Sequence, residues 1–316
     1  MPFLSVVIPL YNKEKDIEST LKSVFDQTFK DFEIVVVNDG STDNSLALVE
    51  KIKDPRLKIY SISNGGLSYA RNYGVKQASG EHIAFLDADD IWYANHLSTL
   101  KCLIDKFPNN GWYGTSYKII HKNKKELPSL LFKNWSEGWQ GLITNFFLIN
   151  RTQWLIHICS ICVKKTFFYE IGAFDERLTS EEDIDFYIRI ALRFPIAYAN
   201  VITLRYNMLG SNRISDSSFK DKISIDFGKY RSIEDEREDL KKFLDFFRYT
   251  QYVKFRITSN YLKAKEVRDG IHLENLTLMQ RVLIRMPKFV LIFGKGVKNL
   301  LLSFNVNLQV TGIKRN

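Results

Sequence analysis

Hydrophobic and polar positions follow two alternating patterns over the first hundred residues of the chain. Apolar runs typical of buried strands occur at residues 4–9, 32–37 and 82–86, and a further strand is predicted at 57–62. Segments with apolar residues at helical spacing lie between them, at residues 13–27, 43–53 and 66–79. This order predicts an α/β fold, in which a mostly parallel sheet is covered by helices on both faces. Further along, apolar periodicity predicts a helix at 181–193 and a helical region from about 217.

Polar residues directly follow three of these predicted strands. Asp39 follows the second strand, Asn64-Gly-Gly66 the third and Asp87-Ala-Asp-Asp90 the fourth, and the helix at 66–79 carries Arg71. In such sheets ligands bind at the carboxyl ends of the strands, so we expect these side chains to form one site. The segment 38–43 also fits a plain turn and helix cap, because Gly, Ser, Thr and Asp favour both.

The motif Asp87-Ala88-Asp89 carries the clearest chemistry. Two carboxylates at a strand end can point toward one ion, and Mg²⁺ and Mn²⁺ prefer carboxylate oxygens together with substrate phosphates. Such an ion would offset the charge of a departing diphosphate. The alternative is that Asp89 and Asp90 only cap a helix that begins near Tyr93.

Five motifs recur in order over residues 3–215, and together they resemble those of the inverting family 2 glycosyltransferases with a GT-A fold, of the kind that builds bacterial surface polysaccharides. They are Val6-Val-Ile-Pro-Leu-Tyr-Asn12, Val35-Val-Val-Asn-Asp-Gly-Ser-Thr-Asp43, Gly66-Leu-Ser-Tyr-Ala-Arg-Asn-Tyr-Gly74, Phe85-Leu-Asp-Ala-Asp-Asp-Ile-Trp92, and Gly172-Ala-Phe-Asp-Glu176 with Glu182-Asp183. We therefore expect a GT-A domain at 1–216 and a separate helical region at 217–316.

The resemblance implies a nucleotide-sugar donor, most often a UDP-sugar, and a divalent ion, Mn²⁺ or Mg²⁺. It gives Asp39 contact with the nucleobase, Asp87 contact with the ribose and Asp89 the metal. The remaining residues that it places at the donor are Pro9, Tyr11, Asn12, Arg71 and Ala88. Family members often carry a His after the last core strand, but residues 204–213 contain none, which leaves a third protein ligand to the metal open.

The resemblance also implies that Asp183 is the general base, with Glu182 orienting it or touching the acceptor; Asp185 is a weaker candidate. The alternative is that these acids only complement the dipole at the start of their helix. We expect a base in this position to stay ionised at neutral pH, as the removal of a proton from an acceptor hydroxyl requires. Residues 111–165 are expected to wall the acceptor side, although their four Trp residues and His157 also fit a core.

Composition narrows the class of protein. The chain has 316 residues with 45% hydrophobic content, and no uncharged apolar run approaches the roughly 20 residues of a membrane-spanning helix. Its three Cys residues do not form a disulfide framework, and we interpret Cys159 and Cys162 as buried thiols. We expect a cytoplasmic enzyme. The alternative is a catalytically silent nucleotide- or carbohydrate-binding protein, since fold alone does not decide activity.

The net charge of +9 is concentrated in one region. Residues 1–216 hold equal numbers of acidic and basic residues, so the whole excess lies in the last hundred. The segment 278–304 is basic and amphipathic, which suits the surface of an anionic membrane, and we expect Pro287 to kink or divide its helix. A helix packed on the protein and a homo-oligomer contact remain alternatives. Nucleic-acid binding is not expected, because no zinc or recognition-helix motif is present.

Overall fold

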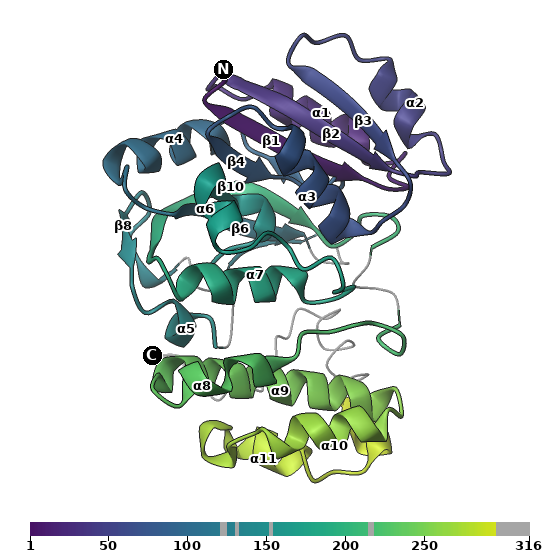
Figure 1. Cartoon of the computed structure of the whole chain (residues 1–316), viewed down its shortest axis with the longest axis vertical. Helices are drawn as coiled ribbons and strands as arrows, with labels where there is room; N and C mark the ends of the chain where they lie inside the picture. The colour runs from purple at the N-terminus through teal and green to yellow at the C-terminus, as the bar shows by residue number, and fades with distance from the viewer. Residues whose placement is uncertain (121–124, 130–132, 152–153, 214–217, 295–316) are drawn as a thin grey trace. The chain divides into compact units, whose positions relative to one another are not determined.

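The computed structural model describes residues 1–120, 125–129, 133–151, 154–213 and 218–294. The chain divides into two compact units. The first contains residues 1–146, 154–216 and 223–225, and the second contains residues 147–153, 217–222 and 226–316. Figure 1 shows the sheet of the first unit and the helices of the second.

The four strands predicted from the first hundred residues form one half of a ten-stranded sheet, in the order β3-β2-β1-β4. All three pairings among them are parallel, as predicted. Strands β1, β2 and β4 are buried along their whole length because both of their faces are covered, whereas β3, at the edge, is partly exposed. The strands are β1 (Leu4–Leu10), β2 (Phe32–Asp39), β3 (Leu57–Ile62) and β4 (His82–Phe85).

The other half of the sheet is mixed. A short antiparallel strand, β9, lies between β4 and β6, and β10 then pairs with β6 in parallel. Antiparallel partners complete the edges, so the sheet is less parallel than its first half suggests. The strands are β5 (Ile91–Trp92), β6 (Trp112–Ile120), β7 (Glu126–Pro128), β8 (Gln140–Ile143), β9 (Ile161–Lys164) and β10 (Ile196–Asn207).

Each helix predicted in this unit is present but shorter than its apolar periodicity suggested. The helix α3 packs against β1 and β2, and the approach is close, because a Cβ at Gly74 would lie 2.4 Å from a methyl carbon of Val7. The helices are α1 (Ile17–Phe25), α2 (Ser45–Glu50), α3 (Leu67–Gln77), α4 (His96–Lys106), α6 (Lys165–Glu170) and α7 (Glu182–Ala191), with the 3-10 turn η2 (Ile158–Ser160). The short helix α5 (Phe146–Ile149) begins at the last residue of this unit's first segment and otherwise belongs to the second unit.

The second unit is helical. A core of aromatic and aliphatic side chains joins the long helix α9 to α10 and α11, and it is formed by Tyr249, Tyr252, Phe255, Ala264, Leu276 and Ile284. Beyond Pro287, residues 288–294 are helical again, so the proline divides the helix as predicted. The elements are η4 (Phe227–Tyr230), α8 (Arg231–Glu234), α9 (Glu238–Ile257), α10 (Tyr261–Asp269), η5 (Leu273–Asn275) and α11 (Leu278–Leu283).

A buried ionic network lies inside this second unit. The guanidinium of Arg248 donates two hydrogen bonds of 2.7 Å to the carboxylate of Glu234 and one of 3.1 Å to Asp245. Asp245 also accepts 2.7 Å from the side-chain amide of Asn275 and lies 3.2 Å from His272. The network ties α8, α9 and η5 together. Among the described residues, no helix is long and apolar enough to cross a membrane.

Candidate active site

Asp39, at the carboxyl end of β2, organises the loop that follows β3. Its carboxylate accepts hydrogen bonds from the backbone N–H of Gly65 at 2.7 Å and of Gly66 at 3.0 Å. Burial raises the pKa of Asp39, and the two N–H groups offset part of that rise. The side chain of Asn64 donates to the backbone carbonyl of Asp39 at 3.0 Å. The structure thus brings together the polar residues that follow β2 and β3, as the sequence predicted.

The end of β1 meets this loop. Pro9 is a buried residue of β1, whereas Tyr11 follows the strand and is exposed. Asn12 adopts a left-handed backbone conformation with φ +52°, and its side-chain oxygen accepts 2.8 Å from the backbone N–H of Thr42. The loops after β1 and β2 are therefore fixed side by side at the carboxyl ends of their strands.

Arg71 joins two carboxylates that come from distant parts of the chain. Its fully buried guanidinium donates to Asp87 at 2.7 Å and to Glu182 at 3.2 Å. Burial alone would raise the pKa of Asp87, but the positive charge of Arg71 holds it below its usual value. Asp87 keeps 26% of its side chain exposed, so one face of this carboxylate remains available to a ligand.

Asp89 is paired with Lys13, a residue outside the five sequence motifs. The ammonium of Lys13 lies 2.6 Å from the Asp89 carboxylate and also donates to the backbone carbonyl of Ser211. Burial raises the pKa of Asp89, Lys13 lowers it, and the charge of Asp87 adds to the rise. Lys13 lies directly after the first motif, in the loop that follows β1, and that position is the clue that could have found it.

The segment after β10 covers this carboxylate. A Cβ at Gly210 would lie 2.4 Å from Asp89 Oδ2, so only glycine fits there without a shift. Ser211 donates to Asp16 from its backbone at 3.1 Å and from its hydroxyl at 2.8 Å. In this chain, the segment in which family members often carry a His therefore lies against Asp89 at Gly210, and its Ser211 carbonyl accepts from the Lys13 that pairs with Asp89.

The helix-cap interpretation of Asp89 and Asp90 is wrong. The residues after them form strand β5, and α4 begins only at His96 with Asn95 as its N-cap. Asp90 instead accepts 2.8 Å from the backbone N–H of Asn207 and is completely buried. The interpretation of 38–43 as a turn and helix cap holds in part, because Asp43 accepts a hydrogen bond of 2.9 Å from the backbone N–H of Ser45 at the start of α2.

Asp183 lies in the first turn of α7, directly after the Glu182 that Arg71 binds. Glu181 precedes them with φ +68°, a conformation that bulky side chains rarely adopt, and it turns the chain into the helix. Burial and then the neighbouring charge of Glu182 raise the pKa of Asp183 to about 7. Burial thus opposes the ionisation at neutral pH that was expected for a carboxyl group at the start of a helix. A pKa near 7 suits a general base.

Asp185 belongs to the core. Its carboxylate is 1% exposed and receives Arg189 at 2.9 Å, one helical turn away. Arg189 also donates to the backbone carbonyls of Ile171 and Ala173, both at 2.7 Å. Asp185 therefore anchors the loop after α6 on α7, and it is not a second base.

The segment 111–165 contains both core residues and partly exposed aromatic residues. Trp112 is completely buried and packs near Phe146 and Tyr187, so it does not face an acceptor. Trp154 is half-buried, and its ring lies 5.5 Å from that of Tyr187, one turn after Asp183. The ring of His157 lies 4.2 Å from that of Tyr206. Trp135 and Trp139 stack on each other at 5.4 Å.

The Asp87–Asp89 pair fits a hard divalent ion. Both side chains are partly exposed carboxylates. Burial raises the pKa of Asp89, the charge of Asp87 adds to the rise, and a bound cation would lower it. Within the described parts of the chain, Asp90, His157 and Cys159 also bring ligand atoms within 4.8 Å of one another. That cluster fits less well, because burial raises the pKa of the Cys159 thiol and His157 Nδ1 already accepts from the Cys159 N–H. Cys159 Sγ instead accepts 3.2 Å from the backbone N–H of Asp87.

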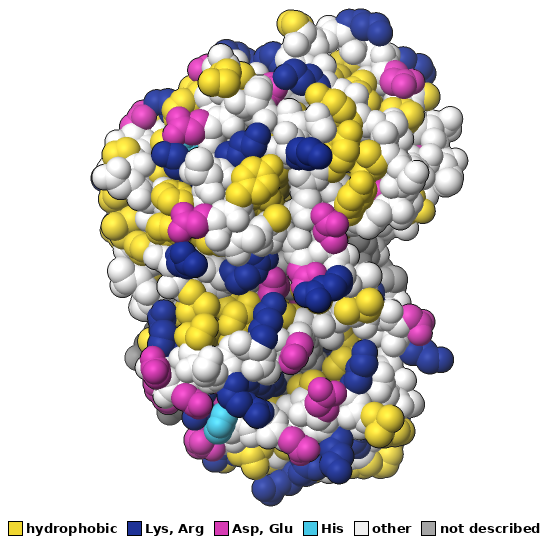
Figure 2. All heavy atoms as spheres, in the orientation of Figure 1, with side chains coloured by type: hydrophobic (Ala, Val, Ile, Leu, Met, Phe, Trp, Pro, Cys, Tyr) yellow, Lys and Arg dark blue, Asp and Glu magenta, His cyan; other side chains and the backbone are white. Residues whose placement is uncertain are grey.

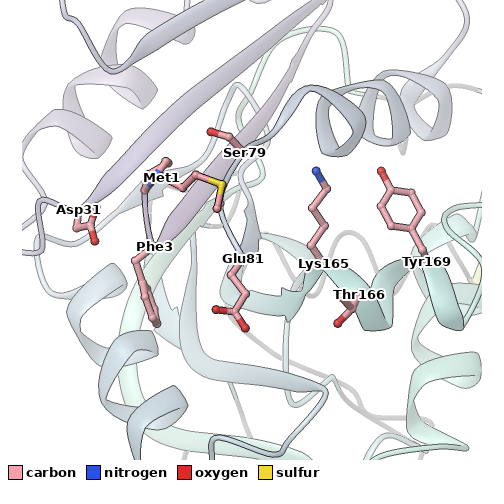
Figure 3. A pocket seen from close by; sticks show the side chains of 10 residues that line it. Met1, Phe3, Asp31, Ser79, Glu81, Lys165, Thr166 and Tyr169 are labelled. Carbon is pink, nitrogen blue, oxygen red and sulfur yellow. The ribbon is translucent and has the colours of Figure 1, made fainter.

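A hollow of about 630 Å³ lies away from these carboxylates, among residues that precede β1, β2 and β4 (Figure 3). Phe3, Asp31 and Glu81 line it together with Lys165. These residues mark the amino ends of the parallel strands, whereas ligands of such sheets bind at the carboxyl ends. The candidate site therefore remains the cluster of carboxylates and its two cations.

Solved structures of known proteins share the fold of this chain. The fold resembles S. aureus TarS in the structure of its residues 1–349 in complex with UDP-GlcNAc, with a TM-score of 0.59 and 24% identity, covering 77% of this chain and 66% of that one. This likeness and the mixed sheet confirm the predicted GT-A fold.

Two proteins named as glycosyltransferases are similar to this chain in sequence. An uncharacterized glycosyltransferase of Rickettsia felis is 31% identical over 226 residues, which cover 68% of this chain but only 36% of that protein. The Escherichia coli protein WfgD, named a UDP-Glc:alpha-D-GlcNAc-diphosphoundecaprenol beta-1,3-glucosyltransferase, is 39% identical over 121 residues, 38% of this chain and 47% of WfgD. Residues 5–176, more than half of the chain, match the family described as "Glycosyl transferase family 2", and the chain belongs to that family.

Proposed function

We propose that this protein transfers a sugar from a UDP-sugar to an acceptor hydroxyl with inversion at the anomeric carbon. The observation that carries the proposal is the bridge from Arg71 to both Asp87 and Glu182. It joins the predicted donor side of the site to the helix of Asp183, whose pKa of about 7 suits a base. If the Arg71–Glu182 pair only held the fold together, the neighbouring Asp183 would not need a raised pKa.

The donor lies along the carboxyl ends of β1, β2 and β4 in this proposal. Asp39 accepts from the N–H of a uracil base, with Pro9, Tyr11 and Asn12 beside the nucleoside, and Asp87 binds the ribose. Two named proteins support the choice of UDP: TarS, whose structure contains UDP-GlcNAc, and WfgD, named for UDP-Glc. Arg71 and Lys13 supply positive charge near the diphosphate.

The reaction needs no covalent enzyme intermediate. The acceptor oxygen forms its bond to the anomeric carbon while the bond from that carbon to the diphosphate breaks, and Asp183 takes the hydroxyl proton. Asp89, with Asp87, would hold Mn²⁺ or Mg²⁺, whose positive charge offsets that of the leaving diphosphate. Glu182, held by Arg71, keeps the first turn of α7 in place beside the reacting atoms.

The acceptor in this proposal is a glycan or lipid-linked glycan of surface polysaccharide synthesis, handled in the cytoplasm. Support comes from the diphosphoundecaprenol acceptor in the name of WfgD. Half-buried Trp154 beside Tyr187 offers an aromatic surface next to Asp183, and aromatic faces suit sugar rings.

A donor screen tests the proposal. The full chain is incubated with UDP-, GDP- and dTDP-sugars with and without Mn²⁺, and hydrolysis and thermal stabilisation are measured. We expect a UDP-sugar to be hydrolysed slowly and to stabilise the protein, in both cases only with the metal. Full activity of Asp89→Ala in EDTA would contradict the metal role. Binding of a UDP-sugar without turnover, even with candidate acceptors, would favour a catalytically silent binding protein.

A further inference from the structure

The last described helices expose apolar side chains where a soluble helix normally presents polar ones. Six residues form this outward apolar face, and each is between 47% and 79% exposed: Leu278, Met279, Val282, Phe289, Ile292 and Phe293. On α11 they recur at steps of one and three, and on the helix at 288–294 at steps of three and one. Each set therefore makes a single stripe on its helix.

The core of the second unit does not need these side chains. Ile284 and Leu291, from the same stretch of chain, are 2% and 5% exposed and supply the contacts toward the interior. Gln280 is buried as well, in a capping box with Thr277 at the start of α11. These helices are thus apolar on both sides, and only one side is used for folding.

The charge of this region has one sign. From residue 275 to 294 the ionisable side chains are Arg281, Arg285 and Lys288, and none is acidic. Arg285 is exposed, while Lys288 donates to the hydroxyl of Ser259. That contact places the turn before α10 beside the face, and Leu262, 86% exposed, follows it. Figure 2 shows hydrophobic and basic side chains at its lower end, over α10 and α11, with acidic side chains among them.

We propose that the outward apolar face docks on the surface of an anionic lipid membrane. Exposed Phe and Leu side chains enter the boundary between headgroups and acyl chains, and the basic residues beside them attract acidic headgroups. A second copy of the chain fits less well, because a two-fold interface brings the same surface against itself and so opposes like charges. The proposal adds a location to the enzyme and does not depend on the chemistry proposed above.

Flotation of the full chain with vesicles tests it. Vesicles of phosphatidylglycerol and phosphatidylcholine are compared with pure phosphatidylcholine, at low and high salt. The wild type should float with the anionic vesicles at low salt, and binding should weaken in high salt or on neutral vesicles. The double variant Phe289→Glu, Phe293→Glu should lose at least about tenfold in partitioning, because it replaces the exposed apolar groups that enter the membrane by charges that the headgroups repel.

A matched control separates this effect from a general change in charge. Tyr169→Glu with Leu142→Glu introduces the same two charges at exposed apolar positions of the first unit, and it should float like the wild type. Circular dichroism and thermal unfolding check that both double variants are folded. Equal flotation of the two double variants, or no flotation of the wild type, overturns the proposal. So does a dimer, seen by light scattering, that is lost in Phe289→Glu, Phe293→Glu while vesicle binding is absent throughout.

Discussion

Two buried arginines, one in each unit, make nearly the same contacts, but their carboxylate partners differ in exposure. Arg71 holds Asp87 and Glu182, and Arg248 holds Glu234 and Asp245, with distances between 2.7 and 3.2 Å in both networks. The difference lies in the carboxylates. Those of Arg71 keep 26% and 14% of their side chains exposed, whereas those of Arg248 keep 2% and 0%.

This comparison shows why a buried ion pair does not identify a site by itself. A fully enclosed pair can only hold helices together, and its charges are satisfied within the protein. A pair whose acids reach the surface can exchange part of its electrostatic interaction for a ligand. The site is therefore recognised by the exposed side of Asp87 and Glu182 together with the perturbed Asp183 beside them.

Replacing each arginine by methionine gives the largest expected effect and tests the comparison directly. Arg248→Met leaves Glu234 and Asp245 buried without a counter-charge and should lower the free energy of unfolding by roughly 3–5 kcal/mol. Arg71→Met should lower it less, about 1–3 kcal/mol, because water can reach its acids, but it should abolish measurable UDP binding. Urea unfolding and calorimetric titration measure the two quantities.

The matched control is Arg177→Met, whose side chain is 85% exposed beside Asp175, and it should change stability by about 0.5 kcal/mol or less. If Arg71→Met and Arg248→Met lose the same stability and neither affects UDP binding, the two networks are both structural and the distinction fails.

Asp183→Asn tests the functional side alone. The amide keeps the shape of the carboxyl group but cannot accept a proton, so turnover should fall by roughly 10²-fold or more with UDP affinity unchanged. Single-turnover kinetics and calorimetry measure rate and affinity separately, and Asp105→Asn, on the exposed face of α4, is the control. A collapse of donor affinity with an unchanged rate per bound complex would make Asp183 a binding residue.

The parallel half of the fold could be predicted because β1, β2 and β4 are mostly apolar runs and β3 carries apolar residues between polar ones, and the observed ends agree within two residues. Strand β9 could not, because Ile161–Lys164 is too short to give a period and its antiparallel pairing depends on tertiary contacts. The thiols of Cys159, just before this strand, and of Cys162, within it, are free and buried, as predicted.

The motifs identify the residues of the candidate site, but they do not show which of these residues contact one another. The Arg71–Glu182 pair spans 111 positions and the Lys13–Asp89 pair 76, so spacing along the chain says nothing about either. The pKa of Asp183 was misjudged for the same reason: the helix terminus is visible in the sequence, but the desolvation that dominates is not. In the last segment, positions 295–304 lie outside the described residues, so its predicted continuation stays a prediction.

The raised pKa of Asp183 predicts that turnover and thermal stability depend moderately on pH. The base acts when deprotonated, so turnover should fall about tenfold per pH unit below pH 7 and level off above it. The folded state binds this proton more tightly than the unfolded chain, where the pKa is near 3.8, so the carboxyl group costs stability increasingly between about pH 4 and pH 7. Asp183→Asn should therefore unfold at a higher temperature than the wild type at pH 8, with the difference shrinking toward pH 4. A difference independent of pH would contradict the raised pKa.

Replacement of Lys13 gives the smallest expected effect. It tests whether the Lys13–Asp89 pair takes part in ligand binding or is only structural. Its ammonium occupies one side of Asp89, where a divalent ion would bind, so Lys13→Met should raise Mn²⁺ affinity about three- to tenfold. The same variant should weaken UDP binding in EDTA, because a cation near the diphosphate is lost, while Lys13→Arg should retain it. Paramagnetic resonance of Mn²⁺ and calorimetry with UDP measure both, with exposed Lys15→Met as the control. If neither affinity changes, the Lys13–Asp89 pair is structural like that of Arg248, and the charge on the donor side comes from Arg71 alone.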